Sequence, residues 1–149
     1  MRRLGLVAAA LCLSSPARAD TAAPGRVVVR GDRLELREPI LFDTGKATLK
    51  PQSHALLDDV ARALGDNAWI AEIDVGVHTD ERGADAYNLR ISDERAAAIK
   101  AYLVAHGVAD ARVTAHGFGE TRPLCSEHNE ACWSRNRRVE LLITKPTHK

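Results

Sequence analysis

The chain has 149 residues, a length that suits one domain with one hydrophobic core. It carries 21 basic and 20 acidic side chains, and removal of a predicted leader at residues 1–19 would leave 18 basic against 20 acidic, a formal net charge of −2. This balance argues against nucleic acid or an anionic membrane surface as the partner.

The first 19 residues have the pattern of a secretory signal peptide. A basic start precedes the short apolar run 4–13, and Ala17-Arg18-Ala19 fits the small-x-small cleavage site. The apolar run is too short for a permanent membrane helix. Leu11, which precedes Cys12, is not the small residue that a lipoprotein signal requires. We therefore expect an exported protein without an integral membrane segment, divided into a signal peptide (1–19), a linker (20–25), a folded domain (26–145) and a tail (146–149).

Periodicity and turn residues predict the elements of the domain. Alternating apolar residues favour strands, and Pro51, Gly65 and Gly107 mark helix ends. Ser92 is a good N-cap, so we expect the second helix to begin there. In chain order, the prediction is a hairpin over 27–36, a short strand at 40–42, a helix over 51–65, a strand over 71–77, a helix over 92–107, and strands at 113–115 and 139–143.

This order predicts an α/β (α+β) fold, a mixed sheet covered by two main helices. Helical crossovers would make the strands at 40–42, 71–77 and 113–115 parallel, so that their carboxyl ends share one edge. Asp43 and Asp80 would lie at that edge, and the loop 119–137 would return to it. In open α/β sheets this edge is where ligands bind.

Arg95 is the most unexpected residue of this edge. In the first turn of a helix that begins at Ser92, a cation is disfavoured by ~0.3–1 kcal/mol, which indicates either a binding role or an ion pair with a nearby carboxylate. An arginine, two aspartates and helix N-terminal amides together suit a zwitterion. Arginine and amides bind a carboxylate, and aspartate binds an ammonium.

Cys125 and Cys132 are the two cysteines that remain after cleavage. An even pair in an exported protein predicts a disulfide, which would stabilise the fold by roughly 2–3 kcal/mol. The alternative is a metal site formed with His128, but this set lacks an obvious fourth ligand. We expect no metal and no other cofactor.

A series of motifs resembles the OmpA-like C-terminal domain, the peptidoglycan-binding module shared by OmpA, MotB and Pal. The similarity extends from about Leu34 to Ile143, and the usual glycine before His-Thr-Asp is replaced by Val77. Two stretches, 80–83 and 128–131, are closest to Pal. The matching residues are Phe42, Gly45 and Leu49, then His78-Thr79-Asp80, Gly83, Tyr87-Asn88, Ile91-Ser92, Arg95-Ala96, Gly117-Phe118-Gly119-Glu120, and Asn136-Arg137-Arg138-Val139-Glu140.

The resemblance implies non-covalent binding of peptidoglycan and no enzymatic activity. The ligand would be the diaminopimelate residue of the stem peptide, whose free end carries an ammonium and a carboxylate. The protein would anchor the cell envelope to the wall, in the periplasm or at the outer membrane, with envelope proteins such as the Tol system as further partners. Asp80 and Arg95 would be the anchors, Asp43, Asn88, Thr79 and Ile91 would complete the pocket, and Arg138 would form a structural ion pair beneath it.

Two alternatives remain open at this stage. A small exported cell-wall hydrolase could use Asp80 with His78 or Asp43, but the sequence has no recognised nucleophile frame and no HExxH motif. We therefore interpret His78 as a packed polar residue. The other alternative is a family scaffold that has lost wall binding, for which Val77 would be the responsible change.

Overall fold

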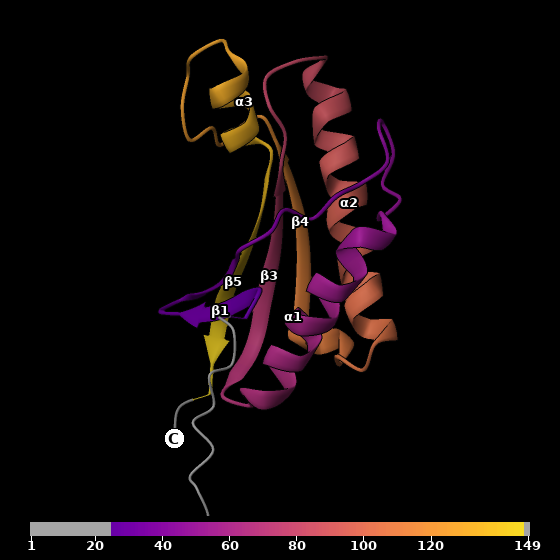
Figure 1. Cartoon of the computed structure of the whole chain (residues 1–149), viewed down its shortest axis with the longest axis vertical. Helices are drawn as coiled ribbons and strands as arrows, with labels where there is room; N and C mark the ends of the chain where they lie inside the picture. Colours follow the sequence, from indigo (N-terminus) through magenta and orange to yellow (C-terminus); the bar gives the residue numbers. More distant parts are fainter. Residues whose placement is uncertain (1–24, 148–149) are drawn as a thin grey trace, which may run out of the picture.

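The sheet of this protein is open and mixed, with helices packed against it. The computed structural model describes residues 25–147 (Figure 1), so the predicted signal peptide and nearly all of the predicted linker lie outside the described part. Five strands follow the order β1-β2-β5-β3-β4. The elements are β1 (Val27–Arg30), β2 (Arg33–Leu36), α1 (His54–Asp66), β3 (Ile70–His78), α2 (Asp85–Ala105), β4 (Val113–Gly119), α3 (Glu130–Asn136) and β5 (Arg138–Pro146), with short 3-10 turns at Pro51–Ser53 and Asp110–Arg112.

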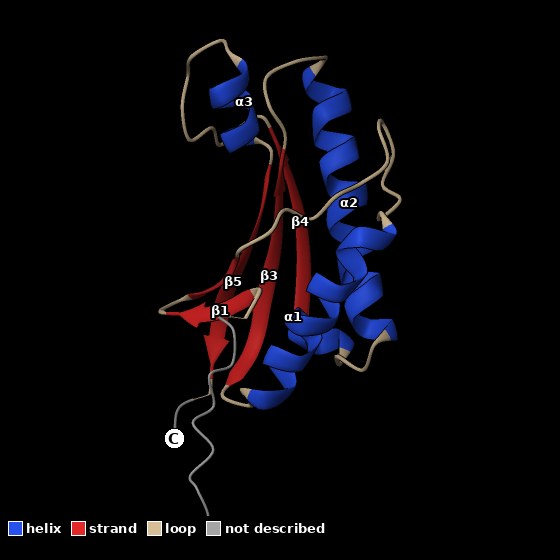
Figure 2. Cartoon of the chain, in the orientation of Figure 1, coloured by secondary structure: helices blue, strands red, loops and turns tan. Residues whose placement is uncertain are grey.

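The hydrophobic core lies between the sheet and the two long helices (Figure 2). Alternate residues of β3 point into it, because side chains of a strand alternate between faces. Helix α2 contributes residues at a spacing of three to four, as a helix with one buried face must. The largest fully buried side chains are Leu56, Leu57, Leu64, Ile70, Ile73, Ile99, Leu103 and Leu141. The predicted fold class is therefore confirmed.

The strand pairings confirm part of the predicted topology. Strands β3 and β4 are parallel and are joined by α2, whereas β5 is antiparallel to β3. The expected parallel strand at 40–42 is wrong, because this segment forms only an isolated bridge between Phe42 and Leu49. Strand β3 pairs with β5 on one side and with β4 on the other, so no pairing position beside it is left for this segment. The segment instead turns back on itself through Gly45, whose φ is +65°.

Helix α2 begins at Asp85, seven residues before the predicted start at Ser92. Ser92 is a buried residue inside the helix, where its hydroxyl donates to the Leu89 carbonyl and accepts from the Gly119 amide, both at 2.9 Å. A small polar residue here serves a close approach to β4 and not a helix cap. Arg95 consequently lies in the middle of α2, and the expectation that it opposes the field of its own helix terminus is wrong.

Helix α2 and strand β4 approach each other most closely at Gly117. A Cβ atom built there would lie 2.1 Å from the Asp93 amide nitrogen and 2.5 Å from the Asp93 Cα. The Gly117 amide donates to the Asp93 carboxylate at 2.8 Å, which ties the two backbones together. Because the obstacle is helix backbone, it cannot rotate away as a side chain could.

Among the described residues, no helix is long and apolar enough to cross a membrane.

We expect Gly117→Ala to lower the free energy of unfolding by roughly 2–3 kcal/mol, because the new methyl group would push α2 off the sheet. Gly65→Ala is the matched control, since Gly65 lies in α1 with open space at its Cβ position. That change should be neutral or stabilising by up to about 1 kcal/mol. Urea denaturation of both variants measures the difference, and equal stabilities would contradict the close packing described here.

Candidate ligand-binding site

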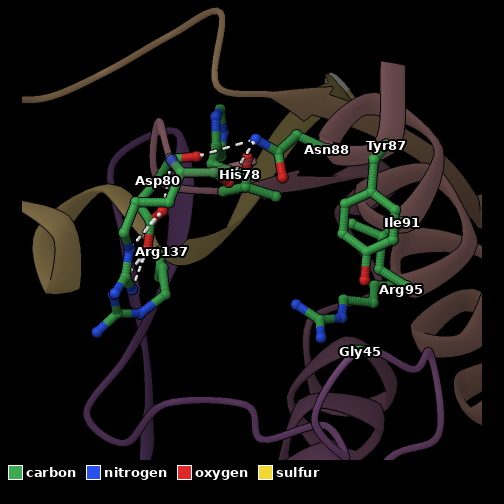
Figure 3. Close-up of a pocket in the computed structure, with 10 residues that line it drawn as sticks. Gly45, His78, Asp80, Tyr87, Asn88, Ile91, Arg95 and Arg137 are labelled. Carbon is green, nitrogen blue, oxygen red and sulfur yellow. Dashed lines mark hydrogen bonds and ion pairs between the residues drawn. The ribbon is translucent and has the colours of Figure 1, made fainter. Parts of the chain in front are cut away.

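A cavity of about 360 Å³ opens at the carboxyl end of β3 (Figure 3). One side is formed by the end of β3 and the loop after it, and the other by α2. Figure 3 shows Asp80 and Arg137 on the first side, and Arg95 and Tyr87 on the second. The lining residues are Gly45, His78, Thr79, Asp80, Arg82, Tyr87, Asn88, Ile91, Arg95 and Arg137.

Asp80 is the best-connected residue of the cavity. Its carboxylate is only 8% exposed and accepts hydrogen bonds at both oxygens. Oδ1 accepts from the Arg82 amide at 2.9 Å and from Arg82 Nε at 3.2 Å. Oδ2 accepts from Arg82 Nη2 and from Arg137 Nη1, both at 2.8 Å. A nearly buried carboxylate is thus held between two guanidinium groups from segments far apart in the sequence.

These contacts set the protonation state of Asp80. Burial alone would raise the pKa of the carboxyl group, but the hydrogen bonds from Arg82 and Arg137 outweigh it and lower the pKa to about 2. Hydrogen bonds and cations that favour the charged form act in this direction. Asp80 therefore carries a negative charge at any physiological pH.

Asn88 orders the loop that holds Asp80. Its side-chain amide donates to the backbone carbonyls of Asp80 at 3.3 Å and Arg82 at 3.0 Å. The loop bends at Gly83, whose φ of +96° favours glycine. The end of β3 is fixed by the Thr79 amide, which donates to the Gly119 carbonyl at 2.9 Å. The first turn of α2 and the end of β4 therefore define the position of the carboxylate.

Arg95 faces the cavity from α2. Its Nε donates to the Lys46 carbonyl at 3.0 Å, and its guanidinium lies 5.0 Å from the centre of the Phe42 ring. Burial lowers the pKa of the guanidinium, and the nearby Tyr87 opposes that shift. Within residues 25–147, Arg95 forms no ion pair with a carboxylate, in contrast to Arg82 and Arg137. It presents a cation that the described part of the protein does not neutralise.

The structure brings most of the predicted site residues together. Asp80, Arg95, Asn88, Thr79 and Ile91 all line the cavity. Asp43 does not line it, although Gly45 of the same turn does; the Asp43 backbone closes the turn 43–48 through hydrogen bonds with Lys46 and Thr48.

Arg82 and Arg137 line the cavity but were missing from the predicted site. Two signals in the sequence could have found them. Arg82 follows Asp80 by two residues, and Arg137 ends the loop that was expected to return to this edge.

His78, which also lines the cavity, forms a cluster with Phe118, Glu140 and Arg138. His78 stacks on Phe118 with ring centroids 5.1 Å apart, and its burial lowers its pKa to about 4, so the ring is neutral at pH 7. Its Nε2 lies 3.6 Å from Glu140. Arg138 donates from Nε to Glu140 at 2.8 Å. His78 thus faces Glu140 and not Asp80, which does not favour the dyad that a hydrolase would need.

A disulfide between Cys125 and Cys132 confirms the predicted pairing and closes the loop before α3.

Helix α3 stands at the cavity end of the sheet (Figure 1) and was not predicted. Trp133 from this helix donates to Glu81 at 2.9 Å and carries the Arg82 guanidinium 4.4 Å above its ring. His128, the third ligand of the alternative metal site, bonds to Glu81 instead. The disulfide loop therefore supports the Asp80 side of the cavity.

Comparison with known proteins gives consistent matches. The sequence model of the OmpA family matches residues 41–137. Outer membrane protein A of Bordetella avium is 44% identical over 105 residues, which cover 68% of this chain and 52% of that protein. Peptidoglycan-associated lipoprotein of Pseudomonas aeruginosa is 37% identical over 100 residues, covering 67% and 58%. The chain thus spans about half the length of these two relatives.

Solved structures agree with these matches. The peptidoglycan-associated lipoprotein from Burkholderia pseudomallei superposes with a TM-score of 0.61 at 35% identity, covering 69% of this chain and 86% of that one. The cell wall anchor of the T6SS from Pseudomonas aeruginosa gives a TM-score of 0.65 at 28% identity, covering 80% and 88%.

The Asp80 contacts predict a pH-dependent contribution to stability. Because the pKa of about 2 in the folded state lies below the unfolded value, the contribution is fully present above pH 4 and is lost as the pH falls through 2. We expect wild type to exceed Asp80→Asn by about 1–2 kcal/mol in the free energy of unfolding at pH 7, and the gap to close toward pH 2. His78 titrates in both proteins, so its contribution cancels from the difference between their free energies of unfolding. A gap that stays constant from pH 7 to 2 in urea titrations would contradict the assignment.

Proposed function

This chain belongs to the OmpA family, and from that premise we propose that it binds peptidoglycan without covalent attachment and without catalysis. The ligand is the diaminopimelate residue of the stem peptide, and binding anchors part of the cell envelope to the wall. The names of two similar proteins, a peptidoglycan-associated lipoprotein and a cell wall anchor, support the proposal.

One observation carries this proposal: opposite charges stand on two sides of one cavity and do not pair with each other. Asp80 is charged and held by Arg82 and Arg137, and Arg95 lies across the opening without a carboxylate partner among residues 25–147 (Figure 3). The free end of diaminopimelate has one ammonium and one carboxylate. The carboxylate binds Arg95, and the ammonium binds Asp80.

The contacts around the two anchors explain how binding can be reversible and specific. Asp80 exchanges part of its hydrogen bonding with the arginines for the ligand ammonium, so no bare buried charge is created at any stage. Arg95 is held in place by Lys46 and Phe42 before the ligand arrives. A group fixed in advance loses little side-chain entropy on binding.

Val77 does not argue for a scaffold that has lost wall binding. Its side chain belongs to the hydrophobic core and is 3% exposed, and the residue is not part of the cavity lining. Valine in place of the usual glycine therefore adds an apolar side chain to the core and takes no space from the ligand.

We further place the protein on the exported side of the cell, in the periplasm or at the outer membrane, where the wall is found. The predicted signal peptide and the disulfide both fit an oxidising compartment. Contact with envelope proteins such as the Tol system is part of the proposal and rests on the Pal-like stretches 80–83 and 128–131.

We expect Arg95→Ala to abolish co-sedimentation with purified sacculi, because loss of one partner of a desolvated charge contact costs roughly 2–5 kcal/mol. Arg90→Ala is the control on the same helix, since Arg90 pairs with Glu94 and does not line the cavity. It should bind like wild type. Undiminished binding by the Arg95 variant would sink the proposal.

A muramyl tetrapeptide with diaminopimelate as its third residue should displace the protein from sacculi, whereas the same tetrapeptide with lysine there should compete poorly. In a stem peptide the α-amino and α-carboxyl groups of lysine are both consumed in amides, so its side chain offers an ammonium but no carboxylate, and Arg95 would stay unmatched beside a ligand that removes its water. The difference should be roughly 1–3 kcal/mol, measured by calorimetry with both peptides. Equal affinities would refute a pocket that binds both ends of a zwitterion, even if sacculus binding survived.

A further inference from the structure

The arginines that line the cavity outnumber its carboxylates, and one bound zwitterion, being neutral, does not balance this excess of positive charge. Resting on the proposed function, we infer that Arg137 and Arg82 form a second carboxylate-binding position opposite Arg95. The preferred ligand is then a stem peptide that ends at diaminopimelate, because only such an end presents a free carboxylate at both ends of this residue.

The charges of the lining residues give the first argument. Three guanidinium groups, those of Arg82, Arg95 and Arg137, face a single carboxylate, that of Asp80. Glu130 also pairs with Arg137, but its side chain is 65% exposed, so solvent screens much of that contact. One zwitterion is neutral and leaves this surplus unchanged. A second carboxylate would reduce it.

The free donors of the two arginines give the second argument. Arg82 uses Nε and Nη2 for Asp80, and Arg137 uses Nη1 for Asp80 and Nη2 for Glu130. A guanidinium has five N–H donors. Within the described part of the chain, Arg82 Nη1 and Arg137 Nε make no hydrogen bond to protein. Both residues can therefore hold Asp80 and contact a ligand carboxylate at the same time.

The second position is also held by contacts within the protein before any ligand binds. Arg82 lies over Trp133, which is itself hydrogen-bonded to Glu81. Arg137 follows α3 directly, and the disulfide between Cys125 and Cys132 ties that helix to the loop before it. Preorganised donors favour charged acceptors, because hydrogen bonds to an ionised group are about twice as strong as neutral ones.

The chemistry of the ligand completes the argument. Diaminopimelate has a carboxyl group at each end of its chain. In a stem peptide that continues beyond this residue, one of the two is consumed in an amide and carries no charge. When the peptide ends there, both are free, and one can face Arg95 while the other faces Arg137.

The test compares a muramyl tripeptide that ends at diaminopimelate with the same molecule carrying an amide in place of the terminal carboxylate. Calorimetry on the wild-type protein should show tighter binding of the acid by roughly threefold to tenfold. The muramyl tetrapeptide should bind like the amide. Because this comparison needs no variant, it does not depend on how a substitution affects folding.

A pair of variants then assigns the preference to Arg137. In Arg137→Gln the ratio of the two affinities should fall toward one, whatever happens to the affinities themselves. Arg135→Gln should keep the wild-type ratio, since Arg135 is an exposed residue of α3, two positions before Arg137, and does not line the cavity.

The outcomes separate this inference from the proposed function. Equal binding of acid and amide by wild type, or an unchanged ratio in Arg137→Gln, would overturn the second carboxylate position and leave peptidoglycan binding in place. Failure of the acid, amide and tetrapeptide alike to bind would overturn the proposed function and this inference with it.

Discussion

The structure of the site depends on one buried charge. The carboxylate of Asp80 ends β3, and its ion pairs with Arg82 and Arg137 bring the loop before α2 and the start of β5 to the same point. A charge that is 8% exposed is tolerated only when paired, and loss of one partner leaves the others uncompensated. The ion pair between Asp80 and Arg137 therefore joins two segments that are 57 residues apart and fixes the shape of one side of the cavity.

The other side depends on backbone packing. Helix α2 lies so close to β4 that Gly117 has no room for a Cβ atom and Ser92 bonds directly to the Gly119 amide. This contact sets the position of α2, and with it the position of Arg95. Because Asp80 and Arg95 belong to different elements fixed by different forces, neither can collapse onto the other. Their charges remain available to a ligand, which is the physical basis of the proposed capture of a zwitterion.

Sequence patterns predicted the parts of this fold that rest on local signals. The alternation in β3, β4 and β5, the hairpin of β1 and β2, and the cysteine pair were all readable. The start of α2 was not, because Ser92-Asp93-Glu94 looks like an N-cap, and only tertiary contact with β4 shows that Ser92 is a packing residue. The segment 40–42 had strand character, but β3 already pairs with β5 and β4 and leaves it no place beside the central strand. Competition between segments for one partner has no local signature.

The anchors Asp80 and Arg95 could be proposed from motifs, but only part of their surroundings could. Arg82 is a near neighbour of Asp80 in the sequence, whereas Arg137 meets Asp80 only after the chain has folded. Asp43 lies outside the cavity lining, although Gly45 of the same turn belongs to it. The central claim is that a ligand carboxylate binds Arg95, and NMR of arginine side chains tests it most directly. On titration of ¹⁵N-labelled protein with diaminopimelate, the account predicts that the Nε–Hε resonance of Arg95 shifts and that of Arg90 does not. An Arg95 resonance that stays in place while the protein saturates with ligand would contradict it.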